Sequence, residues 1–245
     1  MTAAIVTIGN FDGVHLGHLK LIRETVERSR ALGLCSYAIT FDPHPEAVLF
    51  PERKLSYLST ADERQALLVE TGIDSVWVCP FTRELSRLDP EDFMRMVTER
   101  QPIAELWVGA DFALGHDRRG TIAVLAGMGA KMGWALHMVP PYNLEGQVVS
   151  STAIRTLLAA GAVRGAADLL GRNYSITGEL NGTDFFVDPQ RALPRPGAYD
   201  TELRADRSVH EVTATVQSTP GRLTLNGPVP PHIGVATLTF LRRGD

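Results

Sequence analysis

Two histidines three residues apart lie at the start of a predicted helix. His15 and His18 close residues 9–18, which follow an apolar run at residues 3–8 and lead into an amphipathic helical pattern. Side chains at positions i and i+3 share one face of a helix, and the free N–H groups and dipole of its first turn attract anions. The chain contains no Walker-type phosphate loop. This spacing predicts chemistry on a nucleotide triphosphate, with a purely structural strand-to-helix turn as the alternative.

A second cluster suited to phosphate follows much later in the chain. Ser150, Ser151 and Thr152 precede an apolar stretch, and Arg155 lies one turn further on. Hydroxyl and free N–H groups at a helix start, with an arginine on the next turn, form a suitable receptor for phosphates. Taken alone, such hydroxyl residues are more often a helix cap. We predict that this cluster and the imidazole pair converge on a single polyphosphate.

Two further segments leave predicted strands at the sheet edge where ligands bind in open α/β folds. In residues 40–45, two prolines flank His44 and stiffen the loop. The alternative is a stiff loop whose histidine faces solvent. Residues 108–115 turn at glycine after an apolar run. Arg118 and Arg119 follow in a polar loop, where they could face phosphate but are more simply interpreted as solvated charges.

These candidate residues need a sheet to hold them, and the apolar runs predict one. The runs alternate with helical patterns, which is typical of a parallel sheet covered by helices on both faces. We therefore expect a doubly wound α/β fold. The expected strands are residues 3–8, 34–41, 75–79, 106–108 and 134–139.

Local signals predict where helices begin and end. A capping box at residues 60–63 and the pair Asp89–Pro90 predict two helix starts, the second with an aspartate side-chain cap. Gly161 and Gly171 lie where two later short helices are expected to stop. Both phosphate candidates are therefore expected to open helices.

From about Asn173 the sequence changes character. Short strand-like stretches, such as residues 209–216, alternate with turns rich in proline and glycine, and no convincing helix separates them. With 245 residues, the chain is long enough for one sizeable core and a smaller second unit. We expect an α/β domain over residues 1–172, followed by a small β-rich, barrel-like domain over residues 173–245.

Composition indicates which kinds of partner are disfavoured and in which cellular compartment the protein is expected. The formal net charge of −4 and the absence of a Lys/Arg cluster argue against nucleic acid and anionic membrane surfaces as partners. The chain starts without a positively charged leader, and no apolar run approaches the roughly 20 residues of a membrane span. Cys35 and Cys79 lie in apolar runs, so we interpret both as core residues in a reducing compartment. The expected location is the cytoplasm.

Four ordered segments together carry a family resemblance. Residues 9–18, Gly-Asn-Phe-Asp-Gly-Val-His-Leu-Gly-His, resemble the GxFDGVHxGH signature of the bacterial bifunctional riboflavin kinase/FAD synthetases, which belong to the HxGH nucleotidylyltransferases. Residues 40–45, 108–115 and 149–155 fit the same family in the same order. The resemblance implies a Rossmann-like nucleotidylyltransferase domain that transfers AMP from ATP to FMN, giving FAD and pyrophosphate.

The resemblance also implies roles for single residues. His15 and His18 are the expected catalytic residues, which bind the ATP phosphates and stabilise the transition state. The other expected ATP-binding residues are Gly9, Asn10, Phe11, Asp12, Gly17, Ser150, Ser151, Thr152 and Arg155. The expected flavin-binding residues are Asp42, Pro43, His44, Pro45, Asp111 and Phe112. For Asp12, bracing the turn is an equal alternative. No metal-ligating residue is expected, and Mg²⁺ is expected to accompany the triphosphate of ATP.

This sequence departs from the family pattern in four ways. Ala153 stands where relatives commonly carry another arginine, and Ala113 and Leu114 replace bulkier or aromatic residues, so that Leu114 can only pack. Residues 182–194 contain no Pro-Thr-Ala-Asn, the segment that serves Mg²⁺-ATP in the riboflavin kinase module. The chain also ends short of the helix that usually closes that module. We therefore expect a reduced, inactive kinase-like barrel.

Several functions remain open from the sequence. The preferred one is an ATP:FMN adenylyltransferase, with ATP and FMN as its small-molecule partners. The alternatives are a bifunctional riboflavin kinase/FAD synthetase, a nucleotidylyltransferase for another phosphate acceptor, and a non-catalytic flavin or nucleotide-binding module. The HxGH core reads the nucleotide and not the acceptor, so it leaves the acceptor undetermined. The oligomeric state is likewise undetermined.

Overall fold

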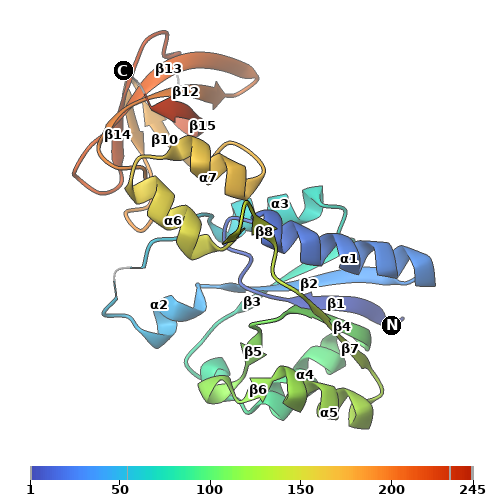
Figure 1. The fold of residues 1–245 in the computed structure, drawn as a ribbon. Coiled ribbons are helices and arrows are strands. Elements are labelled where there is room, and N and C mark those ends of the chain that lie inside the picture. Colours follow the sequence, from blue (N-terminus) through green and yellow to red (C-terminus); the bar gives the residue numbers. More distant parts are fainter. Residues whose placement is uncertain (1, 54, 232, 244–245) are drawn as a thin grey trace. The chain divides into compact units, whose positions relative to one another are not determined.

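The computed structural model describes residues 2–53, 55–231 and 233–243. Contacts between residues divide the chain into two compact units (Figure 1). The first unit consists of Met1–Arg53 and Ala61–Val148, and the second of Lys54–Thr60 and Val149–Asp245. The later part of the segment between helices α2 and α3 thus belongs to the second unit, although both helices belong to the first.

The first unit is built on a five-stranded parallel sheet with the strand order β3-β2-β1-β4-β7. The strands are β1 (Ala4–Ile8), β2 (Cys35–Asp42), β3 (Ser75–Pro80), β4 (Ile103–Gly109) and β7 (Ala135–Val139). All five lie where the apolar runs predict them, so the predicted parallel α/β sheet is confirmed. The order of the strands reverses between β1 and β4, and ligands of open α/β sheets bind at the carboxyl ends of strands beside such a switch point.

Helices cover both faces of this sheet (Figure 1). They are α1 (Leu16–Leu32) and α3 (Ala61–Glu70) on one face, with α4 (Pro90–Arg100) and α5 (Ile122–Met132) on the other. Neighbouring residues of β2 enter different apolar clusters, since Ala38 packs with Ile22 of α1 and Ile39 packs with Phe93 of α4. Because successive strand residues point to opposite faces, strands covered on both sides must be apolar throughout.

Short elements complete the first unit. They are α2 (Pro45–Leu49), the 3₁₀ helices η1 (Leu85–Arg87) and η2 (His116–Arg118), and the two-residue strands β5 (Ala113–Leu114), β6 (Gly120–Thr121), β8 (Asn143–Leu144) and β9 (Gln147–Val148). β5 pairs with β6, and β8 pairs with β9.

Two local expectations need correction. Pro90 occupies the first turn of α4 as predicted, but the side chain of Asp89 makes no capping hydrogen bond. Cys79 is buried, whereas Cys35 is exposed. The prediction that both cysteines are core residues is therefore wrong for Cys35, because it is the first residue of β2 and lies at the uncovered end of the strand.

The second unit contains a closed antiparallel barrel with the strand order β10-β11-β14-β13-β12-β15. The strands are β10 (Ser175–Asn181), β11 (Asp184–Phe186), β12 (Gly197–Ala205), β13 (Ser208–Val216), β14 (Arg222–Asn226) and β15 (Ile233–Arg243). Large side chains such as Phe185, Tyr199 and Phe240 are fully buried. The expected small β-rich, barrel-like fold is confirmed.

Two helices precede the barrel in the same unit. They are α6 (Ser151–Ala159) and α7 (Val163–Leu170), which contact each other, and α7 also contacts β15. Gly161 follows the end of α6 and Gly171 ends α7, both with positive φ, as their positions predict.

Backbone pairing at Tyr57 holds the segment before α3 in this second unit. The N–H of Tyr57 donates to the Gln190 carbonyl at 3.0 Å, and the N–H of Ala192 donates to the Tyr57 carbonyl at 2.9 Å. Between them, buried Arg191 donates to the Tyr174 hydroxyl and the Ser175 carbonyl. The chain just before α3 is therefore anchored to the second unit.

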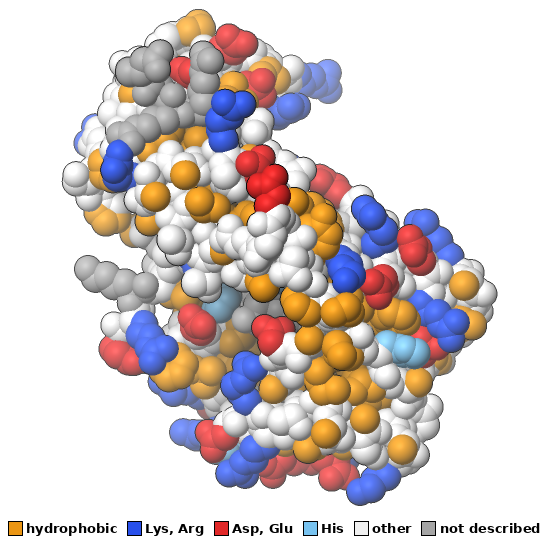
Figure 2. All heavy atoms as spheres, viewed as in Figure 1, with side chains coloured by type: hydrophobic (Ala, Val, Ile, Leu, Met, Phe, Trp, Pro, Cys, Tyr) orange, Lys and Arg blue, Asp and Glu red, His pale blue; other side chains and the backbone are white. Residues whose placement is uncertain are grey.

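Charged side chains of both signs are spread over the surface. The face drawn in Figure 2 shows Lys and Arg interspersed with Asp and Glu, without a broad patch of either sign. None of the helices that the structure describes is long and apolar enough to cross a lipid bilayer.

Candidate functional site

The turn between β1 and α1 has an unusual backbone. Phe11 and Val14 have φ values of 49° and 39°, and Gly13 has φ of 77°. Residues with side chains rarely adopt positive φ, and where they do, the strained turn often serves a ligand. A Cβ atom at Gly9 would lie 3.0 Å from the Phe11 ring, so a larger residue there would press against that ring.

Strand β2 holds this turn in place. The N–H of Gly9 donates to the Ile39 carbonyl at 3.0 Å, and the Thr40 hydroxyl donates to the Asn10 carbonyl at 3.0 Å. The predicted segments at residues 9–18, 40–45 and 108–115 follow or end β1, β2 and β4. Since parallel strands all end at one edge of the sheet, the first unit brings these three segments to a common edge.

The two predicted catalytic histidines lie against each other. Their rings stack with centroids 3.6 Å apart and planes inclined by 16°. His15 is the N-cap of α1, where its Nδ1 accepts the backbone N–H of His18 at 3.3 Å. The Phe11 ring packs edge-to-face against the His18 ring, with the ring centroids 5.3 Å apart. The predicted shared face is present, and His15 has a capping role in addition to any contact with a ligand.

The surroundings of His18 favour a neutral ring. Burial lowers the pKa of His18 well below its ordinary value, and repulsion from His15 and Arg64 acts in the same direction. Nδ1 of His18 is shielded from solvent and has no hydrogen-bond partner among the residues that the structure describes. The residue as a whole is only partly buried. The neutral form of the His18 ring is therefore favoured, and its Nδ1 makes no hydrogen bond to the described residues.

Arg64 is a site neighbour that sequence reasoning missed. It lies on the buried face of α3, one turn before Leu68, and only 3% of it is exposed. Its Nη2 donates to the Phe41 carbonyl at 2.6 Å. Burial lowers the pKa of Arg64, although attraction to Asp12 and Asp42 opposes this. The available signal was an arginine within the apolar stripe of a predicted helix.

The position of Asp12 bears on its two predicted roles. Its side chain is buried, with 2% of the residue exposed, and its charge interacts with that of Arg64. A buried carboxylate close to a buried guanidinium is typical of a brace within the protein. This geometry favours the alternative in which Asp12 braces the turn.

Residues 40–45 end β2 and begin α2. Asp42 is exposed at the last position of the strand, and its peptide bond to Pro43 is cis. His44 is the N-cap of α2, with Nδ1 accepting the N–H of Glu46 at 3.2 Å, and Pro45 is the first helical residue. His44 is partly buried. It is thus a structural part of the loop and does not simply face solvent.

Residues 108–115 include the end of β4, a tight turn at residues 110–112, and β5. Asp111 is exposed, and Phe112 donates its N–H to the Gly109 carbonyl at 3.1 Å. Leu114 is buried in the core, as the prediction that it can only pack requires. Arg118 is exposed, but it donates to the Asp111 carbonyl at 2.8 Å. This arginine therefore closes the loop and is more than a solvated charge.

The hydroxyl cluster opens α6 in the second unit. Ser150 is the N-cap, and its hydroxyl oxygen accepts the N–H of Ala153 at 3.2 Å. Nη2 of Arg155 lies 3.4 Å from the Thr152 hydroxyl. Ser150 is thus the helix cap that the plainer interpretation predicts, and Arg155 lies one turn into the same helix. The histidine pair belongs to the first unit and this cluster to the second.

No dedicated metal cage occurs in the part of the chain that the structure describes, since no group of three or more His, Cys, Asp or Glu side chains could hold an ion. Mg²⁺ in nucleotide sites is commonly bound through the phosphates and one or two carboxylates. Asp42 and Asp111 are exposed carboxylates at or just after the ends of β2 and β4. They fit such a shared ion better than buried Asp12 does.

Comparisons with known proteins give a consistent result. A family model described as FAD synthetase matches residues 1–153. The bifunctional riboflavin kinase/FMN adenylyltransferase of Pseudomonas fluorescens is 34% identical over 96% of this chain and 78% of its own length. Its namesake from Listeria monocytogenes is 28% identical over 86% of this chain and 71% of its own. A putative bifunctional enzyme of Geobacillus thermodenitrificans is 35% identical over 70% of this chain and 91% of its own.

One solved structure is similar over nearly the whole chain. A crystal structure described as a macrolide-efflux protein from Streptococcus pneumoniae matches with a TM-score of 0.85, covering 99% of this chain and 86% of that one. The two sequences are 20% identical. At this identity, the match demonstrates a shared fold and nothing about activity.

Proposed function

Because the chain belongs to the FAD synthetase family, we propose that it is an FMN adenylyltransferase, which transfers AMP from ATP to FMN and releases pyrophosphate. The observation that carries this proposal is the stacked pair of His15 and His18, fixed by a helix cap directly beyond β1. This strand borders the switch point of the sheet, where a nucleotide is expected to bind.

The proposed reaction asks for positioning and charge stabilisation. A phosphate oxygen of FMN attacks the α-phosphorus of ATP, the bond from that phosphorus to the bridging oxygen breaks, and pyrophosphate leaves. Hydrogen-bond donors aimed at the charge that develops on the phosphates lower the barrier to such a transfer. His15 and His18 are the donors proposed for the α-phosphate. Mg²⁺ bound with ATP would screen the triphosphate.

Further residues are proposed to hold ATP. Ser151, Thr152 and Arg155 would bind the β- and γ-phosphates, because they combine hydroxyl groups and a guanidinium with the start of a helix. Phe11 and Asp12 are buried, so they would support the turn and leave phosphate contacts to backbone N–H groups. The remaining proposed ATP-binding residues are Gly9, Asn10, Gly17 and Ser150.

The flavin is proposed to lie along the edge formed by the ends of β2 and β4. Residues 42–45 and the pair Asp111 and Phe112 lie at this edge, and Asp111 offers an exposed carboxylate as a hydrogen-bond acceptor. Substitution of Asp111 by Ala is therefore expected to raise the KM for FMN more than the KM for ATP.

A direct assay tests the proposal. Purified protein is incubated with FMN, ATP and Mg²⁺, and FAD and pyrophosphate are measured as products. We expect stoichiometric formation of both, and at least a hundredfold lower rate in a His15→Ala/His18→Ala variant. FAD formation no higher than in that variant would reject the proposal. Bound flavin without turnover would then favour a binding module.

The acceptor can be tested separately. Ligands that bind the folded protein raise its Tm according to their concentration and affinity. We expect FMN to stabilise the protein, and other phosphate acceptors of nucleotidylyltransferases, such as a pantetheine phosphate, to leave the Tm unchanged. The reverse pattern would favour a transferase with a different acceptor.

We further propose that the chain lacks riboflavin kinase activity. Residues 182–194 contain no Pro-Thr-Ala-Asn segment, so the residues expected to serve Mg²⁺-ATP in the kinase module are missing although a closed barrel is present. Riboflavin and Mg²⁺-ATP are therefore expected to give no FMN. ATP-dependent formation of FMN would show a bifunctional enzyme, as the names of the relatives describe those proteins.

A further inference from the structure

A positively charged side chain, that of Arg64 on α3, is buried in the first unit, near enough to His18 to act on its charge. Only 3% of Arg64 is exposed, and its Nε is shielded from solvent without a hydrogen-bond partner among the described residues. Burying a guanidinium costs free energy unless opposite charges and hydrogen bonds compensate. A side chain held in this way at the edge of a proposed site needs an explanation.

Arg64 interacts with both loops that border the proposed site. It donates a hydrogen bond from Nη2 to the carbonyl of Phe41, next to the last residue of β2. Its charge is attracted by Asp42 at the end of the same strand and by Asp12 in the turn after β1. It also acts electrostatically on His18. The guanidinium therefore lies between the proposed ATP side and the proposed flavin side.

We propose that Arg64 is a positioning residue for the adenylyl transfer proposed above: it joins the end of β2 to the turn after β1 and so fixes the imidazole of His18. This inference rests on the proposed function for its meaning in catalysis. Arg64 acts through Asp12, Phe41 and His18, and is too deeply buried to act by contacting substrate.

The charged groups around His18 make its pKa a measurable test of this role. His15 lies on the same helix, Arg64 lies on α3, and Asp12 and Asp42 act through their attraction to Arg64. Burial remains the largest cause of the low pKa of His18, but Arg64 adds repulsion of the protonated ring. Removing the charge of Arg64 should therefore raise the pKa of His18.

Three variants and one control test the inference. Arg64→Met removes charge and hydrogen bond, Arg64→Gln removes the charge but keeps a donor, and Arg64→Lys keeps the charge. Gln65→Met is the matched control, because Gln65 is the exposed neighbour on the same helix. The measurements are kcat and KM for ATP and FMN, the pH profile of kcat/KM, and NMR titration of the His18 ring, assigned with His18→Asn.

We expect Arg64→Met to lower kcat by about tenfold to a hundredfold, since displaced catalytic groups cost rates of this size. We also expect it to raise the pKa of His18 and to shift the acid limb of kcat/KM to higher pH. In Arg64→Lys, the pKa of His18 and the acid limb of kcat/KM should return to their wild-type values. Gln65→Met should match the wild type in both. If Arg64→Met does not fold, Arg64→Gln is expected to show the same shifts.

Two results would overturn the inference. One is an unchanged His18 titration with kcat within twofold of the control. The other is a loss of kcat that Arg64→Lys does not restore and that leaves the His18 titration unchanged, since Arg64 would then only stabilise the fold. The NMR titration needs no turnover, so a wild-type protein that makes no FAD would reject the proposed function while the effect of Arg64 on His18 was still measured.

Discussion

The ring of His15 does two things for His18: it stacks on the imidazole with centroids 3.6 Å apart, and its Nδ1 accepts the backbone N–H of the same residue. One nitrogen of His15 is therefore committed to capping α1. The orientation of both rings depends on the helix start. The capping role of His15 and its proposed catalytic role can be separated by choosing the substituting side chain.

We predict that His15→Asn and His15→Ala differ in stability and agree in activity. Asparagine caps helices well, whereas alanine loses the cap at a cost of about 1 kcal/mol. Neither supplies the imidazole, so both should reduce FAD formation at least a hundredfold. Urea unfolding, followed by tryptophan fluorescence, measures the stability difference. Wild-type activity in His15→Asn would mean that His15 is only a cap.

The pKa of His18 predicts a stability that falls in mild acid. Because the pKa of His18 in the folded protein lies below the ordinary value of about 6.5, the unfolded chain binds a proton that the folded chain does not. The free energy of unfolding should then decrease below about pH 6.5, by at most about 1.4 kcal/mol per pH unit from this residue. Urea unfolding of the wild type and His18→Asn between pH 7.5 and 5.5 measures it. Equal slopes for the two proteins would contradict the prediction.

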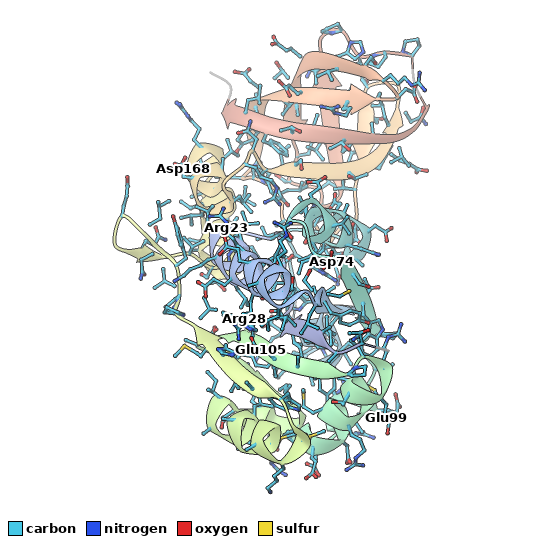
Figure 3. The ribbon with its side chains drawn as sticks, turned by 90° about the vertical axis from the view of Figure 1, so that its right-hand side faces the viewer. Arg23, Arg28, Asp74, Glu99, Glu105 and Asp168 are labelled. Atoms are coloured by element: carbon cyan, nitrogen blue, oxygen red, sulfur yellow. The ribbon has the colours of Figure 1, made fainter. Side chains whose placement is uncertain are left out.

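Glu105 ties α1 to the sheet. Figure 3 shows Arg28 on α1 directed toward Glu105 on β4, with Nη2 of the arginine 2.6 Å from Oε1 of the carboxylate. Oε2 accepts from Trp107 Nε1 at 2.9 Å and lies 3.3 Å from His137 Nε2. The hydrogen bond from Arg28 is the main cause of a lowered pKa of Glu105. This stabilising contribution exists above the ordinary carboxyl pKa and is lost as the pH falls through the lowered value.

We predict that Glu105→Gln lowers the Tm at pH 7 by roughly 2–4 °C and that the difference from the wild type disappears in acid. Glu99→Gln, the same change at an exposed position of α4, is the control and should leave the Tm unchanged. The three tryptophans, Trp77, Trp107 and Trp134, all lie in the first unit, so their fluorescence reports its melting. A Tm difference that persists at pH 3 would argue against the ion pair as its cause.

The two cysteines should react at very different rates. Cys35 is exposed, whereas Cys79 is buried, and burial raises the pKa of the Cys79 thiol to about 11. Because the thiolate is the reactive form, a disulfide reagent at pH 8 should modify one thiol per native chain quickly and the second only after unfolding. Cys35→Ser should abolish the fast phase. Two fast thiols in the native protein would contradict this arrangement.

Hydrophobic patterning predicted the sheet because its strands are rich in apolar residues, and the inner strands β1 and β2 are buried almost throughout between two helical layers. Residues 3–8 and 134–139 were identified as strands on this basis, and β1 and β7 lie there. The same reasoning placed Cys35 in the core, but this residue is exposed. Only tertiary contacts decide which residues of a strand are covered. Hydrophobic patterning therefore locates a buried strand more reliably than it identifies which of the strand's terminal residues are buried.

By itself, the sequence determined the α/β and β-barrel classes, the two helix starts rich in phosphate-binding groups and, through its ordered motifs, the family. Only the tertiary structure decided that His15 caps α1 and stacks on His18, and that Arg64 lies buried beside the turn after β1. The physical reason is distance along the chain. Motifs and periodicity report interactions between near neighbours, whereas the environment of a buried charge depends on the packing of segments remote in sequence, here α3 against the end of β2.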